Sequence, residues 1–245
     1  MSDFDPPFLP PDMPLTPARL AAFRAAARDL QGIDIDAYTA SGKDPLDPIL
    51  GLGAPTRRIA FFGRDPGRDE VRRGEPFIGA GGQLVRRVIQ EHLTGHAAAD
   101  LDTLSALTAD FFWINTVPYK PVGNKAWSMA AKRRFQPLIA DLLLNVWRGD
   151  TVITLGREAF LWFGIGQPAD TRAQLDAFWA RDDRFVRTLT VSLQTSTTAS
   201  RPLTLCPLPH PSPLNAVWYA RFPGLLRDRL VALDVRRDTL DIRQA

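Results

Sequence analysis

The chain contains a single cysteine, Cys206, among 245 residues. A lone thiol excludes an internal disulfide and any metal or iron–sulfur site that several thiolates would hold. Histidine is scarce too, and two of the 3 histidines, His92 and His96, have the i, i+4 spacing of a helical metal pair. Because no HExxH-type glutamate lies between them and Gly95 ends the helix there, the pair is interpreted as a solvated helix end.

Long apolar runs are also lacking, and a secretory leader is not expected. No run approaches the roughly 18 apolar residues of a membrane span. The chain begins MSDFDPPFLPPDMP, which is acidic and rich in proline. Such a start has neither the basic region nor the apolar region of a signal peptide. We therefore expect a cytoplasmic protein with no membrane partner.

Lysine is the third scarcity. Of 30 basic residues four are lysine and the other 26 are arginine, and the formal net charge is +3. The arginine excess is as typical of a GC-rich genome as of phosphate recognition by planar guanidinium groups. The charge permits an anionic partner without demanding one.

What is present predicts one α/β domain over residues 1–245. Short apolar runs closed by glycine or proline predict strands at 57–63, 111–117, 151–155 and 202–208. Helices are expected from Thr16 toward Gly32 and at 82–93, 100–108, 129–147, 157–163 and 214–232. This alternation is typical of a three-layer α/β/α sandwich around a central, mostly parallel four-stranded sheet. The N-terminal arm, 1–15, and an insertion, 164–200, are expected to be irregular, with a hairpin strand near 185–193 left open.

Polar residues follow three of these strands where each strand ends. Asp65 follows the first strand, Asn115 lies near the end of the second and His210 follows the fourth. Because the carboxyl ends of parallel strands share one edge of a sheet, these side chains are expected in one pocket. A carboxylate can position water and stabilise a sugar cation, an amide can pair with a base edge, and an imidazole can hydrogen-bond a leaving base.

A purely structural interpretation exists for Asp65, Asn115 and His210, and also for two further residues, Phe77 and Leu214. Asp65 lies in a Gly/Pro-rich turn that favours aspartate by itself, and Asn115 can tie a strand end to a loop. Phe77 can be a core residue, and Leu214 can pack in the first turn of the last helix. His210 lies in PLPHPSP, where alternating prolines stiffen an extended loop. A stiff loop suits an imidazole that must be held in place.

These segments resemble the motifs of the uracil-DNA glycosylase superfamily. The matching motifs occur in the family's order over about 57–232, and they are GRDPG at 63–67, GEPFIG at 74–79, INTV at 114–117 and HPSPLN at 210–215. The arm at 1–15 and the segment 164–200 are not covered. Four motifs in register are a specific signal, whereas HPSPL alone is moderately specific.

The resemblance implies a role for each matching residue. Asp65 would orient and polarise the attacking water, and His210 would hydrogen-bond the uracil carbonyl as negative charge builds on the base. Asn115 would read the Watson–Crick edge, Phe77 would stack on the flipped uracil, and Leu214 would fill the gap left in the helix. At the uracil site the resemblance also implies Arg64 and Gly67, and on the DNA it implies Pro66, Ser212 and Pro213.

Two departures from the family pattern stand out. Gly67 occupies the place of a tyrosine that shields the pocket against a C5 methyl in the best-known branch, which puts thymine exclusion by this route in doubt. Other branches bind an iron–sulfur cluster through four cysteines, which this chain lacks. The chain combines an aspartate and HPSPL typical of the first branch with a thermophile-type GEPFIGAGGQ loop. It is identified as a cluster-free member, and no metal or cofactor is expected.

The resulting hypothesis is a monofunctional, monomeric DNA repair glycosylase. It would hydrolyse the N-glycosidic bond of deoxyuridine in single- or double-stranded DNA by base flipping. No lysine lies in the pocket motifs to form a Schiff base. Lys120, a basic residue on the same predicted edge, is expected to contact DNA phosphate. Two alternatives stay open: the same fold acting on other deaminated bases, and a protein that binds uracil or abasic DNA without turnover.

Overall fold

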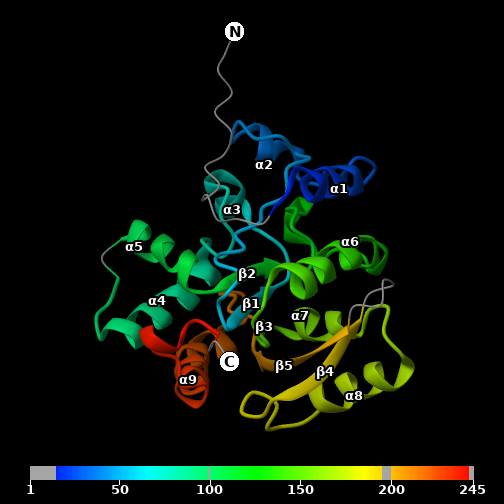
Figure 1. Cartoon of the computed structure of the whole chain (residues 1–245). Helices are drawn as coiled ribbons and strands as arrows, with labels where there is room; N and C mark the ends of the chain where they lie inside the picture. The colour runs from blue at the N-terminus through cyan, green and yellow to red at the C-terminus, as the bar shows by residue number, and fades with distance from the viewer. Residues whose placement is uncertain (1–14, 99, 195–199, 243–245) are drawn as a thin grey trace.

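The structure is a computed structural model that describes residues 15–98, 100–194 and 200–242. In these ranges one sheet has the strand order β2-β1-β3-β5-β4 (Figure 1). Its strands are β1 Ile59–Gly63, β2 Phe112–Asn115, β3 Thr151–Leu155, β4 Leu189–Gln194 and β5 Ser200–Leu208. Neighbouring strands are parallel except for β4, which pairs antiparallel with β5. The mostly parallel α/β sheet is thus confirmed, but the predicted count of four strands is wrong because β4 adds a fifth.

Helices connect these strands. They are α1 Pro17–Ala27, α2 Ile35–Thr39, α3 Arg68–Arg73, α4 Ala80–Thr94, α5 Leu101–Ala106, α6 Met129–Asp141, α7 Arg157–Leu161, α8 Ala169–Trp179 and α9 Ala216–Ala232. A π-helical turn, Leu142–Val146, continues α6. The segment 164–200, expected to be irregular, contains α8, which is a correction, and β4, which agrees with the strand left open near 185–193. The predicted arm at 1–15 lies outside the described residues, apart from Leu15.

Local sequence explains where two of these helices begin. The Thr16 hydroxyl accepts a hydrogen bond from the Arg19 N–H at 3.3 Å, and Pro17 is the first residue of α1. The Ser128 hydroxyl accepts one from the Ala131 N–H at 3.1 Å at the start of α6. Both caps satisfy an N–H group that has no partner inside its helix.

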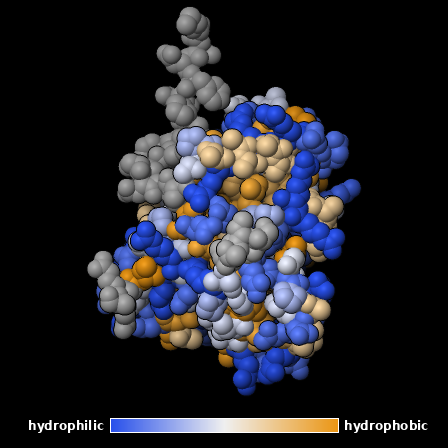
Figure 2. Space-filling model, turned by 45° about the vertical axis from the view of Figure 1, so that its right-hand side comes forward, coloured by the Kyte–Doolittle hydropathy of each residue, from blue (hydrophilic) through white to orange (hydrophobic). Residues whose placement is uncertain are grey.

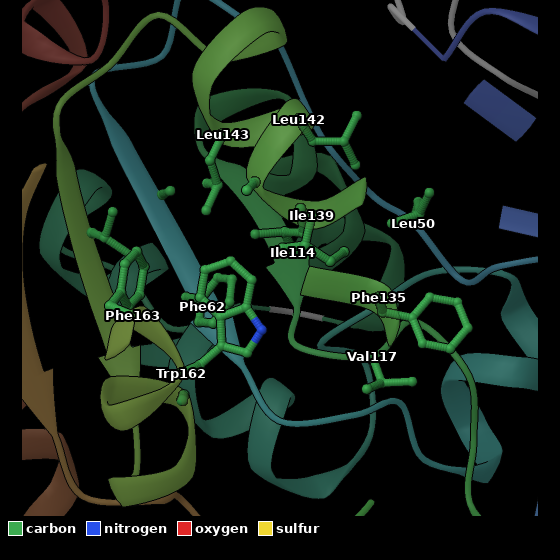
Figure 3. Close-up of a cluster of buried hydrophobic side chains, with 14 of the residues drawn as sticks. Leu50, Phe62, Ile114, Val117, Phe135, Ile139, Leu142, Leu143, Trp162 and Phe163 are labelled. Carbon is green, nitrogen blue, oxygen red and sulfur yellow. The ribbon is translucent and has the colours of Figure 1, made fainter. Parts of the chain in front are cut away.

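Apolar side chains of the sheet alternate between its two faces, as the period of a strand requires. In β1, Ala60 and Phe62 pack in a core cluster with α1, α6, α7 and α8, whereas Ile59 and Phe61 pack in a second cluster with α4 and α9. In Figure 1, α4 and α9 lie on the other side of the sheet from α6 and α8. Figure 3 shows part of the first cluster, where Phe62 packs against Trp162 and Phe163. The α/β/α layers therefore match the prediction.

One face of the molecule is mainly polar. On the face drawn in Figure 2, hydrophilic residues predominate and hydrophobic ones occur in small groups between them. Within the described ranges, no helix combines the length and the apolar character needed to cross a bilayer.

A buried ion pair links α2 to the loop after β2. The Lys120 ammonium lies 2.8 Å from Asp34, and the two side chains are 3% and 14% exposed. The same ammonium donates to the Pro121 carbonyl and to Asn124 Oδ1. Asp34 also caps α2, since it accepts from the Ala37 N–H. Lys120 lowers the pKa of Asp34.

Replacing Asp34→Asn is expected to lower the free energy of unfolding by about 3 kcal/mol, because it leaves the Lys120 ammonium buried without its counter-charge. Asparagine keeps the helix cap, so the loss reports the ion pair. Urea denaturation at neutral pH measures it, with Asp36→Asn on the exposed side of α2 as the control. A loss below about 1 kcal/mol would contradict a buried, charged pair.

Candidate functional site

The parallel register brings the ends of β1, β2, β3 and β5 to one edge of the sheet. Gly63 at the end of β1 pairs with Asn115 at the end of β2. Leu155 at the end of β3 pairs with Leu208 at the end of β5. The loops that carry Asp65 and His210 leave from this same edge. The expected convergence is therefore present in the structure.

Asp65 lies at this edge with only 4% of its side chain exposed. Its carboxylate accepts two hydrogen bonds from Arg64, at 2.6 Å from Nε and 3.4 Å from Nη2. Burial raises the pKa of Asp65 to about 6, although the positive charge of Arg64 opposes this shift. Arg64 Nη2 also donates to the Asn124 carbonyl at 3.1 Å. The carboxylate is thus held in place and ionised at neutral pH.

His210 follows β5 and lies against Gly156, which follows β3. Gly156 has a φ of 95°, and a Cβ there would come 2.9 Å from His210 Cβ, so only glycine fits this position. Desolvation of the ring by the surrounding protein lowers the pKa of His210, and the positive charge of Arg64 lowers it further. The residue keeps an exposed side, and solvent there limits the size of the shift. Its direction leaves the imidazole neutral at pH 7.

Asn115 and Phe77 meet above Gly63. A Cβ at Gly63 would come 2.6 Å from Asn115 Oδ1 and 2.7 Å from Phe77 Cζ, so the missing side chain makes room for both. Asn115 is 3% exposed and Phe77 is 8% exposed. The Phe77 ring also packs against Trp113, with centroids 5.3 Å apart. An amide and an aromatic ring therefore share one wall.

These side chains line a cleft of about 480 Å³. Ten of the residues singled out from the sequence are in its lining: Arg64, Asp65, Pro66, Gly67, Phe77, Asn115, His210, Ser212, Pro213 and Leu214. Leu214 stands at its rim with 99% of its surface exposed. Two other hollows have volumes of about 380 and 400 Å³. The first lies between the end of α4 and the end of α9 with the segment that follows it, and the second lies between α1, with its cap Thr16, and α6. Neither includes a strand end, so the 480 Å³ cleft is the candidate site.

Lys120 was predicted to contact DNA phosphate, but its position in the structure does not support that role. It is 2% exposed, is absent from the cleft lining, and has its ammonium engaged by Asp34, Pro121 and Asn124. An ammonium buried among such partners is not placed to bind a phosphate. The role of this lysine in the structure is to fasten the loop after β2.

Sequence reasoning missed two residues that shape the cleft. Glu70 Oε2 accepts from the Gly67 N–H at 2.8 Å and Oε1 from the Gly79 N–H at 3.0 Å, so one carboxylate joins two loops of the lining. Burial raises the pKa of Glu70, and these N–H groups oppose the shift. A glutamate three residues after an N-cap position is a capping signal that would have predicted α3. Asn124 lies in the lining with a φ of 55°, for which the sequence carries no such signal.

A second charged pair lies behind the cleft. Lys132 of α6 pairs with Glu158 of α7. Glu158 raises the pKa values of both Asp65 and His210, and Lys132 lowers that of Asp65. Among the described residues no group of three or more His, Cys, Asp or Glu side chains has the arrangement of a metal site. Cys206 is buried in β5.

Comparisons with known proteins add an independent finding. The family model described as "Uracil DNA glycosylase superfamily" matches residues 50–233. Curated proteins named type-4 uracil-DNA glycosylase are similar to parts of the chain. The protein of Sulfurisphaera tokodaii is 29% identical over 112 residues, which is 45% of each chain. That of Saccharolobus solfataricus is 28% identical over 111 residues, covering 45% of this chain and 46% of the relative.

A third relative, from Archaeoglobus fulgidus, is 40% identical over 47 residues. This match covers 19% of the chain and 24% of the relative. The matched stretch therefore spans less than half the length of each of these relatives.

Replacing Glu70→Ala is expected to lower the free energy of unfolding by about 2 kcal/mol, because the N–H groups of Gly67 and Gly79 lose their acceptor. Glu70→Gln keeps one acceptor oxygen and should lose about half as much. Urea denaturation compares the two with Asp69→Ala, a half-exposed neighbour on α3. Equal stability of the Ala variant and the wild type would refute the bridging role.

Proposed function

The chain belongs to the uracil-DNA glycosylase superfamily, and we propose that it hydrolyses the N-glycosidic bond of deoxyuridine in DNA. The product is an abasic site, and the reaction serves DNA repair. The observation that carries the proposal is the meeting of Asp65, Phe77, Asn115 and His210 in one cleft. An acid, an amide, an imidazole and an aromatic ring are the groups needed to hold a flipped base and break its bond to the sugar.

Phe77 and Asn115 bind the base in this proposal. The aromatic ring offers a face on which uracil stacks. The amide of Asn115 offers one acceptor and two donors, which match the O4 and N3–H edge of uracil. With the amide held in the orientation that matches uracil, cytosine would set its amino group against the amide NH2 and its unprotonated N3 against the amide oxygen, so cytosine is rejected. Gly63 keeps both side chains close enough to contact one base.

Asp65 and His210 perform the chemistry in this proposal. The Asp65 carboxylate orients a water molecule and offsets the positive charge that develops on the deoxyribose as the bond breaks. His210, neutral at pH 7, donates a hydrogen bond to a carbonyl of the departing uracil as negative charge builds on it. Arg64 holds the carboxylate through two hydrogen bonds. No covalent intermediate is needed, which is why we propose a monofunctional enzyme.

The rim of the cleft is the proposed DNA contact. Leu214 is almost fully exposed beside Pro213 and Ser212. An exposed apolar side chain at this place fits the gap that a flipped nucleotide leaves in the stack. Pro66 and Ser212, which line the cleft, contact backbone phosphates in this proposal. The monomeric state and the cytoplasmic location stay predictions from the sequence.

One observation favours a second candidate substrate class. Gly67 lines the cleft without a side chain, so this part of the wall does not exclude a C5 methyl or a larger deaminated base. Duplexes that carry thymine, hypoxanthine or xanthine in place of uracil distinguish the two candidates. A strict uracil preference eliminates the second one.

The replacement Asp65→Asn is expected to slow excision at least about a hundredfold, because an amide carries no negative charge to stabilise the sugar cation. The measurement is the yield of alkali-labile sites in end-labelled DNA with one uracil. Asp29→Asn, a change at an exposed carboxylate that does not line the cleft, should leave the rate unchanged. If the wild-type protein binds this DNA but yields no such sites, it is a binder without turnover and the proposal fails.

The excision rate is expected to fall about tenfold per pH unit below about pH 6. The cause is protonation of Asp65, whose pKa is raised to about 6 and which acts as the carboxylate. Above that pH the rate should be flat through neutrality, since the depressed pKa of His210 keeps the ring neutral there. Single-turnover rates from pH 4.5 to 8, an interval chosen to bracket the carboxyl pKa, test this. A rate that stays constant down to pH 4.5 would contradict the assigned role of Asp65.

A further inference from the structure

Arg86 is a fully buried arginine that lies outside the cleft lining. It is part of α4 and its side chain has 0% exposure. Its guanidinium donates four hydrogen bonds. Nε donates to the Phe77 carbonyl at 2.8 Å, Nη2 to the Pro76 carbonyl at 3.0 Å, and Nη1 to the Leu104 carbonyl at 2.8 Å and Thr108 Oγ1 at 3.0 Å. A fifth acceptor, Glu75 Oε1, forms an ion pair with Nη2 at 2.9 Å.

Three of these acceptors belong to consecutive residues, 75–77, which form the segment that carries the cleft's aromatic ring. Burial lowers the pKa of Arg86 to about 10, and Glu75 opposes the shift. The guanidinium therefore stays charged at neutral pH. A buried charge is costly unless it is fully hydrogen-bonded. Lysine has three donors and no planar fork, so it cannot replace this set of contacts.

Phe77 needs such a hold because its backbone is strained. Its φ is 59°, in the left-handed region that residues with a side chain rarely adopt. The hydrogen bond from Arg86 Nε fixes the carbonyl of this same residue. Without it, the backbone gains freedom to relax toward negative φ, which turns the ring away from the cleft.

A second connection runs through Trp113. The guanidinium carbon of Arg86 lies 4.4 Å from the centroid of the Trp113 ring. The Phe77 ring lies 5.3 Å from the same indole. Arg86 thus contacts the backbone carbonyl of Phe77 and also packs against the Trp113 indole, which in turn contacts the Phe77 ring.

We infer that Arg86 is a positioning residue that holds Phe77 in the orientation that stacks on the flipped base. This inference rests on the proposed function, since it assigns Phe77 to the uracil. Arg86 itself touches neither base nor DNA. Its loss should therefore weaken binding of the base while leaving the grip on the DNA backbone intact.

The test uses Arg86→Met, which keeps most of the side-chain volume and removes all donors. Two duplexes serve as probes: one with 2′-fluoro-deoxyuridine, which resists cleavage, and one with a tetrahydrofuran abasic analogue. The variant is expected to bind the uracil duplex about tenfold more weakly, because a base–aromatic stack is lost. Its affinity for the abasic duplex should match the wild type. Arg87→Met, at the exposed neighbouring position, is the matched control and should change neither affinity.

A double-mutant cycle with Phe77→Leu separates positioning from general stability. If Arg86 acts through Phe77, Arg86→Met should weaken uracil binding much less in the Phe77→Leu background than in the wild type. Equal effects in both backgrounds overturn the inference. So does a variant that loses affinity for both duplexes equally, since that result reports a merely structural residue.

Should Arg86→Met fail to fold, Thr108→Val removes one acceptor of Arg86 and one hydrogen bond to Glu75, and it leaves the guanidinium charge paired with Glu75. It is expected to weaken uracil binding several-fold and to spare abasic binding, and no change would overturn the inference. Failure of the proposed function has a different signature. In that case the wild-type protein itself binds the uracil duplex no better than unmodified DNA.

Discussion

The parallel pairing of β1, β2, β3 and β5 is the constraint on which the site depends. Gly63 pairs with Asn115 and Leu155 pairs with Leu208, so the four strands end at one level. A shift by one residue would turn every side chain of a strand to the opposite face. It would exchange the two core clusters that cover the sheet. Packing of the two sheet faces therefore fixes the strand register, and with it the positions of Asp65, Asn115 and His210 at the ends of the strands.

Long loops at that edge are held by a few buried polar side chains. Glu70 bridges two loops, Arg86 holds the segment before α4, and Arg64 joins Asp65 to the loop that contains Asn124. Each of these groups is costly to bury alone and is stabilised by its partners. The loops are thereby ordered in a protein whose sheet fixes only their ends. In these ordered loops, desolvation raises the pKa of Asp65 and lowers that of His210.

Several features could be predicted because their signals are local. Apolar runs closed by glycine or proline indicated four of the strands, and Thr16 and Ser128 indicated helix starts that the structure contains. The strand left open near 185–193 is present as β4, whereas α8 was not expected, because it is stabilised by packing against α7, which local patterns do not reveal. Lys120 was misplaced for a similar reason. Its partner, Asp34, lies far away along the chain, so an exposed lysine and a buried one look alike in sequence.

The sequence by itself determined the α/β class, the family motifs and the residue types at each strand end, because turn residues and apolar periodicity act over a few neighbouring positions. Only the tertiary structure decided the strand order, the antiparallel edge strand β4 and the partners of Glu70, Arg86 and Lys120. It also decided the protonation of Asp65, since desolvation depends on what surrounds the carboxylate. Contacts between distant segments set these properties, and such contacts exist only once the chain has folded.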